Sequence, residues 1–304
     1  MPHYQMPDGE QLYVREYGQG QPVLVLSGLG MQSWQWSPFF YTLRKQFKFI
    51  IPDWRGFGGS KNCAIPDLDA ISSHWRDIDS LLQQLNIAPQ QLNVIAYSMG
   101  ATTAMHGMQY AHFSKKLKSY LHIDQTPKIR LDPTWQYGLY SQKQPQFLAL
   151  LMQISSLLST NQQYQNFDQL PTQTRAELLK LWLAFIELQA TNRIAPLLFK
   201  KALKQKALQA HLLPMQRLDY LAWYINNYLH HQEDYRAAIT QLECPATFFI
   251  GAQSQLYPAD GQKIVANSVK NATAIIFEKS GHTPLISEPI KFHQHLHAFL
   301  KQQL

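Results

Sequence analysis

The chain has 304 residues, of which 45% are apolar and 15% are charged, a composition typical of a folded globular protein rather than a disordered one. Its 27 lysines and arginines exceed its 20 aspartates and glutamates, which gives a formal charge of +7. Because the basic residues are scattered along the chain, we expect no nucleic-acid partner. The strongest apolar runs, residues 23–26 and 247–250, are far shorter than the ~20 residues of a membrane span, so we expect no span.

Cysteine usage and the first residues bear on the cellular compartment. Cys63 and Cys244 are far apart and belong to no Cys-x-x-Cys motif. Two cysteines do not make a disulfide framework, so they indicate a reduced protein. Residues 1–10 show no charged-then-apolar signal pattern, and we therefore expect a cytoplasmic location.

Strand and helix patterns alternate along residues 1–130. The predicted strands are 12–17, 23–26, 47–51, 92–96 and 119–123, and the predicted helices are 34–47, 71–85 and a segment from the turn at Ser98 to about residue 110. Regular alternation of this kind predicts an α/β fold with a mostly parallel central sheet covered by helices on both faces.

The pattern changes after residue 130. Residues 131–242 carry helical patterns, at 146–158, 175–190, 196–213 and 217–228, and no convincing strand. Alternation then resumes with strands at 246–250 and 272–277 and helices at 259–267 and 289–300. We therefore predict one core domain in two parts, residues 1–130 and 243–304, interrupted by a helical insertion over 131–242.

The stretch Ala96-Tyr97-Ser98-Met99-Gly100 is the most informative part of the sequence. It follows an apolar run and precedes a helical segment, which is the strand–turn–helix context of a nucleophilic serine. Small residues at 96 and 100 fit a turn at which the strand and the helix pass close together. The alternative is an ordinary polar turn, so the motif needs support from the rest of the chain.

Three further motifs accompany this turn: Ser27-Gly28-Leu29-Gly30, the loop from Asp53 to Ser60, and Gly281-His282 followed by Glu288-Pro289. In this order the four motifs resemble the α/β-hydrolase superfamily, and the resemblance covers essentially the whole chain. It implies an α/β-hydrolase fold in which residues 131–242 form the lid inserted after strand six. It also implies an oxyanion hole made by the backbone N–H groups of Leu29 and Met99.

A serine nucleophile needs a base and an acid partner for that base. His282 is the candidate base because it lies in a glycine-containing loop after the last predicted strand, in the chain order Ser, Asp, His. The family places its acid after the seventh strand, where this chain has Ser254. Asp124, at the end of the sixth strand, is therefore the predicted acid, as it is in haloalkane dehalogenases and cofactor-free quinolone dioxygenases. Asp260 is the alternative acid, but it should already lie within the following helix, where its side chain is poorly placed to reach His282.

Aromatic and small residues near these motifs are candidates for substrate contact. We expect Gly28, Trp34, Trp36 and Tyr97 to line the pocket, although the tryptophans fit packing beneath the lid equally well. Most apolar residues of the insertion should pack in its core, while a minority should face the pocket and favour an apolar acyl or ring group.

Other polar residues receive structural interpretations. We expect Asp53 and Arg55 to form an ion pair or a loop brace near the strand end. His293 and His297 are four residues apart on a predicted helix, but no carboxylate completes a metal-ligand pattern. We therefore expect both histidines to face solvent, and we predict no metal and no cofactor.

These features predict a metal-free serine hydrolase of carboxylic esters or lactones, with N-acyl-homoserine lactones as one specific candidate. Its partner would be a small ester or lactone with an apolar portion, and the protein would be a monomer or a homodimer. A cofactor-free dioxygenase of a quinolone-like substrate, using the pair His282 and Asp124, is the alternative. A non-catalytic receptor on the same scaffold is a third hypothesis.

Overall fold

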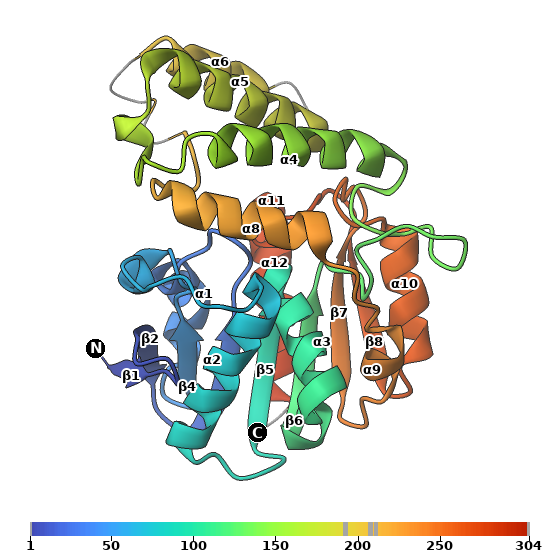
Figure 1. Ribbon diagram of the computed structural model, residues 1–304. Helices are drawn as coiled ribbons and strands as arrows, with labels where there is room; N and C mark the ends of the chain where they lie inside the picture. The colour runs from blue at the N-terminus through green and yellow to red at the C-terminus, as the bar shows by residue number, and fades with distance from the viewer. Residues whose placement is uncertain (1, 191–193, 206–208, 210–211, 303–304) are drawn as a thin grey trace.

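The computed structural model describes residues 2–190, 194–205, 209 and 212–302 (Figure 1). Its centre is an eight-stranded sheet with the order β1-β2-β4-β3-β5-β6-β7-β8. The strands are β1 (His3–Gln5), β2 (Gln11–Gly18), β3 (Gln21–Leu26), β4 (Phe47–Pro52), β5 (Leu92–Tyr97), β6 (Leu117–Ile123), β7 (Ala246–Gly251) and β8 (Ala272–Phe277). Pairing is antiparallel from β1 to β4 and parallel from there to β8, which confirms the predicted α/β class with a mostly parallel sheet.

Residues of the central strands alternate between two cores, one on each face of the sheet. Leu24 and Leu26 belong to one buried cluster, whereas Val23 and Val25 belong to the other. Because successive side chains of a strand point to opposite faces, an unbroken apolar run is what a strand covered on both sides requires.

Helices cover both faces of the sheet (Figure 1). Residues of α2 (Ala70–Leu85), α3 (Met99–Ala111) and α10 (Ala259–Ser268) pack in the first cluster. Residues of α1 (Ser37–Phe40) and α12 (Pro289–Lys301) pack in the second.

The helix predicted over 34–47 is wrong in its length. The structure has two 3₁₀ turns, Ser33–Trp36 and Tyr41–Leu43, on either side of the four-residue α1. Pro38 lies in the first turn of α1. Since proline has no N–H and clashes with the preceding turn, a helix that starts before it cannot run through it unbroken. Strand β1 was not predicted, because three residues carry too little periodicity to detect.

The segment between β6 and β7 forms a separate helical layer above the carboxyl ends of the strands (Figure 1). Its helices are α4 (Gln144–Ser159), α5 (Thr172–Gln189), α6 (Ile194–Leu203) and α8 (Leu218–His230). The short α9 (Arg236–Thr240), which follows α8 in the chain, lies beside the sheet and packs on α3 and α10 (Figure 1). The helix predicted over 196–213 ends at Leu203, and residues 206–208 and 210–211 lie outside the described part of the chain. None of the described helices is long and apolar enough to cross a membrane.

Helix α8 is the part of this layer that is fastened to the core. The hydroxyl of Tyr224 donates to the carbonyl oxygen of Arg55 at 2.9 Å, and the hydroxyl of Tyr220 donates to the carbonyl oxygen of Cys63 at 3.0 Å. Helix α4 packs on α8 and α5, and α5 packs on α6. Helix α8 therefore lies next to the strand ends, α4 packs on α8, and α5 and α6 follow further from the sheet (Figure 1).

Candidate active site

Ser98 lies at the sharp turn between β5 and α3. Its backbone has φ 52° and ψ −120°, a left-handed conformation that a residue with a side chain adopts only under strain. A Cβ atom on Gly100 would lie 2.2 Å from the carbonyl oxygen of Leu26, so only glycine fits where α3 crosses β3. The structure therefore has the strained strand–turn–helix geometry that the sequence predicts around Ser98.

Asp124 follows directly after β6, the strand that pairs with β5. It is fully buried, has φ 41°, and its backbone N–H donates to the carbonyl oxygen of Phe249 at 2.9 Å. Its Oδ1 accepts from the backbone N–H of Gly251 and from Nε2 of Gln262, both at 3.0 Å. These donors fix the orientation of the carboxylate.

His282 connects the other two residues. Its Nδ1 lies 2.7 Å from Oδ2 of Asp124, and its Nε2 lies 2.9 Å from Oγ of Ser98. The hydroxyl of Tyr97 donates to the carbonyl oxygen of His282 at 3.0 Å and holds the loop after β8 in place. When Asp124 is ionised it can only accept, so Nδ1 carries the ring proton and Nε2 is free to accept from the serine hydroxyl. This is the arrangement that activates a serine.

Two other positions bear on the identity of the acid: Ser254, where the family places it, and Asp260, the alternative from the sequence. Ser254 donates its hydroxyl to Oδ2 of Asp124 at 2.7 Å. Asp260 lies in the first turn of α10 and pairs with Lys263 at 3.3 Å. Its exposed side chain points to solvent rather than to His282.

The loop after β3, which carries the predicted oxyanion donor Leu29, is held by the loop after β4. Asp53 accepts from the backbone N–H groups of Ser33 at 2.6 Å and Gly59 at 2.9 Å. Trp54 donates from Nε1 to the carbonyl oxygen of Ser27 at 2.8 Å. Asp53 is therefore a loop brace, one of the two structural roles expected for it.

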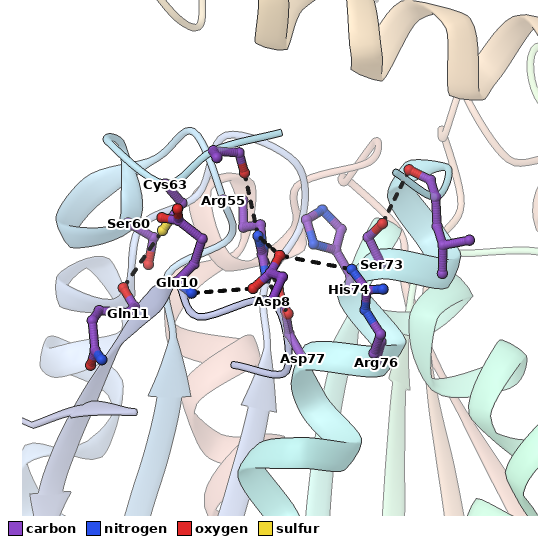
Figure 2. A network of polar contacts seen from close by, with 12 residues as sticks. Asp8, Glu10, Gln11, Arg55, Ser60, Cys63, Ser73, His74, Arg76 and Asp77 are labelled. Carbon is purple, nitrogen blue, oxygen red and sulfur yellow. Dashed lines mark hydrogen bonds and ion pairs between the residues drawn. The ribbon is translucent and has the colours of Figure 1, made fainter. Parts of the chain in front are cut away.

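Arg55 does not pair with Asp53 but anchors the same loop from below (Figure 2). Its guanidinium is fully buried and contacts Asp77 at 2.6 Å and Asp8 at 2.6 Å. Burial disfavours the charged form of all three groups. The two carboxylates nevertheless raise the pKa of Arg55 by more than burial lowers it, so the guanidinium stays charged. The network fixes the base of the loop without reaching the reacting groups.

A cavity of about 310 Å³ opens at Ser98 and His282 beneath the helical layer. The predicted residues Gly28, Leu29 and Tyr97 line it. A minority of the apolar residues of the insertion face the cavity as expected, among them Leu151, Trp182, Phe185 and Met215. The described lining contains no lysine, arginine, aspartate or glutamate, so the cavity suits an uncharged, largely apolar group.

Met99, the second predicted oxyanion donor, is the first residue of α3. Backbone N–H groups in the first turn of a helix have no partner inside that helix, so they are available to an anion. A Cβ atom on Gly28 would lie 3.3 Å from Cβ of Ser98 and 2.9 Å from the ring of Tyr97. Glycine at 28 therefore lets the loop that carries Leu29 approach the serine closely.

The placement of Trp34 and Trp36 in the pocket is corrected by the structure. Trp36 is completely buried in the core below the sheet, where it stacks on Phe40 at 5.6 Å and donates from Nε1 to Oγ of Ser27. Trp34 is 56% exposed and lies outside the cavity lining. Trp36 ends the 3₁₀ turn Ser33–Trp36, and its contacts with Phe40 and Ser27 hold its ring in the core rather than in the cavity.

The histidines of α12 pack against one another and against the core. The rings of His293 and His297 lie 3.9 Å apart, and Nε2 of His297 lies 3.1 Å from Oγ1 of Thr42. They are partly buried rather than solvent-facing as expected. In the part of the chain that the structure describes, no group of three or more His, Cys, Asp or Glu side chains could hold a metal ion.

Several cavity residues were not found from the sequence, among them Tyr140, Phe147, Tyr228 and Tyr257. They come from distant parts of the chain, and only the packing of the helical layer on the strand ends brings them together. Tyrosines in helical or loop segments carry no pattern that distinguishes a pocket wall from an ordinary core.

Comparison with known proteins gives consistent matches over nearly the full length. The family described as alpha/beta hydrolase fold matches residues 21–289. A pimeloyl-[acyl-carrier protein] methyl ester esterase of Chromobacterium violaceum is 25% identical over 292 residues, covering 96% of this chain and 99% of that protein.

Two solved structures extend the comparison. An esterase from Exiguobacterium antarcticum has a TM-score of 0.70 at 18% identity and covers 99% of both chains. The enol-lactonase from Burkholderia xenovorans has a TM-score of 0.67 at 16% identity, covering 99% of this chain and 100% of that one. At these identities the likeness establishes the architecture of the chain.

Proposed function

The chain belongs to the alpha/beta hydrolase fold family, and from this premise we propose that it is a serine hydrolase that cleaves carboxylic esters or lactones. The observation that carries the proposal is the continuous line of contacts from Ser98 through His282 to Asp124, at 2.9 and 2.7 Å. A strained turn, a cavity and a buried acid meet at this line, which an ordinary polar turn would not require.

In the proposed reaction Oγ of Ser98 attacks the ester carbonyl while Nε2 of His282 takes the hydroxyl proton. The carbonyl π electrons move to the oxygen, which the backbone N–H groups of Leu29 and Met99 stabilise, each by on the order of 3 kcal/mol. When the intermediate collapses, His282 gives its proton to the departing alcohol oxygen. Water then attacks the acyl-enzyme by the same sequence and releases the acid.

Asp124 orients the ring of His282 and stabilises its charged form. Its buried carboxylate accepts hydrogen bonds from Gly251, Ser254 and Gln262 in addition to the contact with His282. A carboxylate held by this many donors is preorganised for its role and needs no rearrangement during the reaction.

Residues 131–242 act as the lid in this proposal. Helix α8 forms the roof of the cavity, and α4 and α5 supply part of its wall. The lid encloses the acyl group and excludes water from the reacting atoms until the acyl-enzyme forms.

The names of the relatives support a neutral ester or lactone as the substrate class. The Chromobacterium violaceum relative is named for a methyl ester of an acyl carrier protein conjugate, and the Burkholderia xenovorans structure for an enol-lactone. A methyl ester and a lactone both carry an uncharged carbonyl group, which the uncharged cavity favours.

The test is hydrolysis of a panel of nitrophenyl esters and lactones, including N-acyl-homoserine lactones, by the intact protein and by Ser98→Ala. We expect turnover in a metal-free buffer with chelator and a loss of about 10⁴-fold or more in Ser98→Ala. Oxygen consumption with a hydroxyquinolone, dependent on His282 and without any ester turnover, would instead support the cofactor-free dioxygenase.

A further inference from the structure

Five tyrosines line the cavity, and their hydroxyls differ in whether the protein supplies a partner. Three are engaged: Tyr97 donates to the His282 carbonyl, Tyr224 donates to the Arg55 carbonyl, and Tyr257 accepts from Nε2 of Gln125. Of the other two, Tyr140 has a buried hydroxyl with no hydrogen-bond partner within the described residues, and Tyr228 is half-buried in the cavity wall. This difference is the starting point of the inference.

Tyr140 is held firmly in the wall of the cavity. Its side chain is 3% exposed, and its ring lies 4.7 Å from the ring of Phe147 and 6.4 Å from that of Phe185, both of which also line the cavity. Its backbone has φ 61°, in the left-handed region, and its N–H donates to the carbonyl oxygen of Leu256 at 2.7 Å. Packing and hydrogen bonding therefore fix this ring in the cavity wall although its backbone adopts a conformation that residues with a side chain rarely take.

A buried hydroxyl without a partner destabilises a folded protein, so its retention needs an explanation. Burial raises the pKa of Tyr140, and it raises the pKa of Tyr228 to about 12. Both phenols therefore remain protonated at neutral pH and can donate. A ligand that supplies an acceptor oxygen would satisfy them.

The charge of the cavity limits what that acceptor can be. The lining, as far as the chain is described, has no lysine or arginine to pair with a carboxylate. Burying an unpaired carboxylate is far more costly than burying a ketone, amide or ester oxygen, so a neutral oxygen is the acceptor that fits.

Resting on the proposed ester hydrolysis at Ser98, we propose that Tyr140, together with Tyr228, recognises a second, uncharged carbonyl oxygen in the substrate. The chain would then act on acyl esters or lactones that carry a neutral oxygen acceptor away from the scissile ester, such as a chain ketone or an amide. Plain hydrocarbon esters and esters with a terminal carboxylate would be poorer substrates.

The test compares nitrophenyl octanoate with keto analogues in which one chain CH₂ is replaced by a carbonyl at successive positions, and with the ω-carboxylate analogue. The readout is the ratio of kcat/KM for each analogue to kcat/KM for the plain ester. In the wild type we expect one keto position to give a ratio above one, and Tyr140→Phe to lower that ratio roughly tenfold, the effect of one lost hydrogen bond. Tyr228→Phe should lower the same ratio.

Tyr224→Phe is the matched control, since it also removes a phenol hydroxyl from the cavity wall, but one that already donates to the Arg55 carbonyl. Its ratio should equal that of the wild type. Equal ratios in wild type and Tyr140→Phe at every keto position would overturn the inference, as would a preference for the ω-carboxylate ester. If no ester in the panel is hydrolysed, the proposed function itself fails.

Thermal unfolding of the ligand-free variants gives a second, independent result. Removing a hydroxyl that has no partner should leave the Tm of Tyr140→Phe at or above the wild-type value, whereas Tyr224→Phe should unfold at a lower temperature. A clear drop in Tm for Tyr140→Phe would show that its hydroxyl has a structural partner and would contradict the recognition role.

Discussion

Replacing Asp124 with asparagine changes one atom of the buried carboxylate and leaves its shape intact. Oδ1 of Asp124 accepts from Gly251 and Gln262, which both donate, so the amide oxygen of the asparagine must take that place. The NH₂ group then faces Oγ of Ser254, which can accept, and Nδ1 of His282. The variant should therefore fold.

The exchange reverses the hydrogen bond to His282. With an NH₂ group donating to Nδ1, the neutral ring carries its proton on Nε2, directed at Oγ of Ser98, and can no longer take the serine proton. We expect kcat for a nitrophenyl ester to fall by about 10⁴-fold, equivalent to about 5.5 kcal/mol of transition-state stabilisation.

Initial rates with one good ester substrate, measured for wild type, Asp124→Asn and the control Asp260→Asn, test this prediction. Asp260 is an exposed acid paired with Lys263, so its variant should keep wild-type rates. A loss of less than about tenfold in Asp124→Asn would refute its role as the acid partner of His282.

The position of Ser254 allows a rescue of the same variant. Its Oγ lies 2.7 Å from Oδ2 of Asp124, so a carboxylate at 254 would come within reach of His282. We expect Ser254→Asp to raise kcat of the Asp124→Asn variant by about tenfold or more, because a carboxylate then faces Nδ1 again. The same substitution in the presence of Asp124 should lower kcat, since two carboxylates would share one buried site.

Three stability predictions concern the scaffold around the site, each measured by urea unfolding. Gly100→Ala should lower the free energy of unfolding by about 1–3 kcal/mol, because its Cβ would lie 2.2 Å from the Leu26 carbonyl oxygen; an unchanged midpoint would contradict this close packing. Arg55→Met should cost about 3–5 kcal/mol by leaving Asp77 buried without its cation, and adding Asp77→Leu should recover most of that loss. Burial lowers the pKa of His122 to about 4. Between pH 6.5 and 4 the unfolded chain therefore binds more protons than the folded protein, so the free energy of unfolding falls as the pH falls through this window. His122→Gln should make this fall less steep, and an unaltered pH dependence would argue against a neutral buried ring.

Local patterns explain why much of the fold and the site could be predicted from the sequence. The apolar strand, the small residues and the helix around Ser98 are contiguous in the chain. Asp124 and His282 each follow a predicted strand, and because parallel strands end at the same edge of a sheet, their proximity follows from topology. The absence of an acid at Ser254 then directs attention to Asp124.

Features that depend on packing between distant segments could not be predicted. The location of Trp36 depends on its packing against Phe40 and on its hydrogen bond to Ser27, which belongs to a different loop. Tyr140 and Tyr257 meet at the cavity only because the helical layer sits over the strand ends. The bond between Ser254 and Asp124 is likewise a contact between two strand ends that no local pattern encodes.

Covalent labelling with a fluorophosphonate, located by peptide mass spectrometry, tests the central claim most directly. We predict one adduct, on Ser98, with a labelling rate that falls sharply in His282→Ala because the serine hydroxyl then has no base. A protein that is folded but remains unlabelled at Ser98, or is labelled at the same rate without His282, would contradict the account.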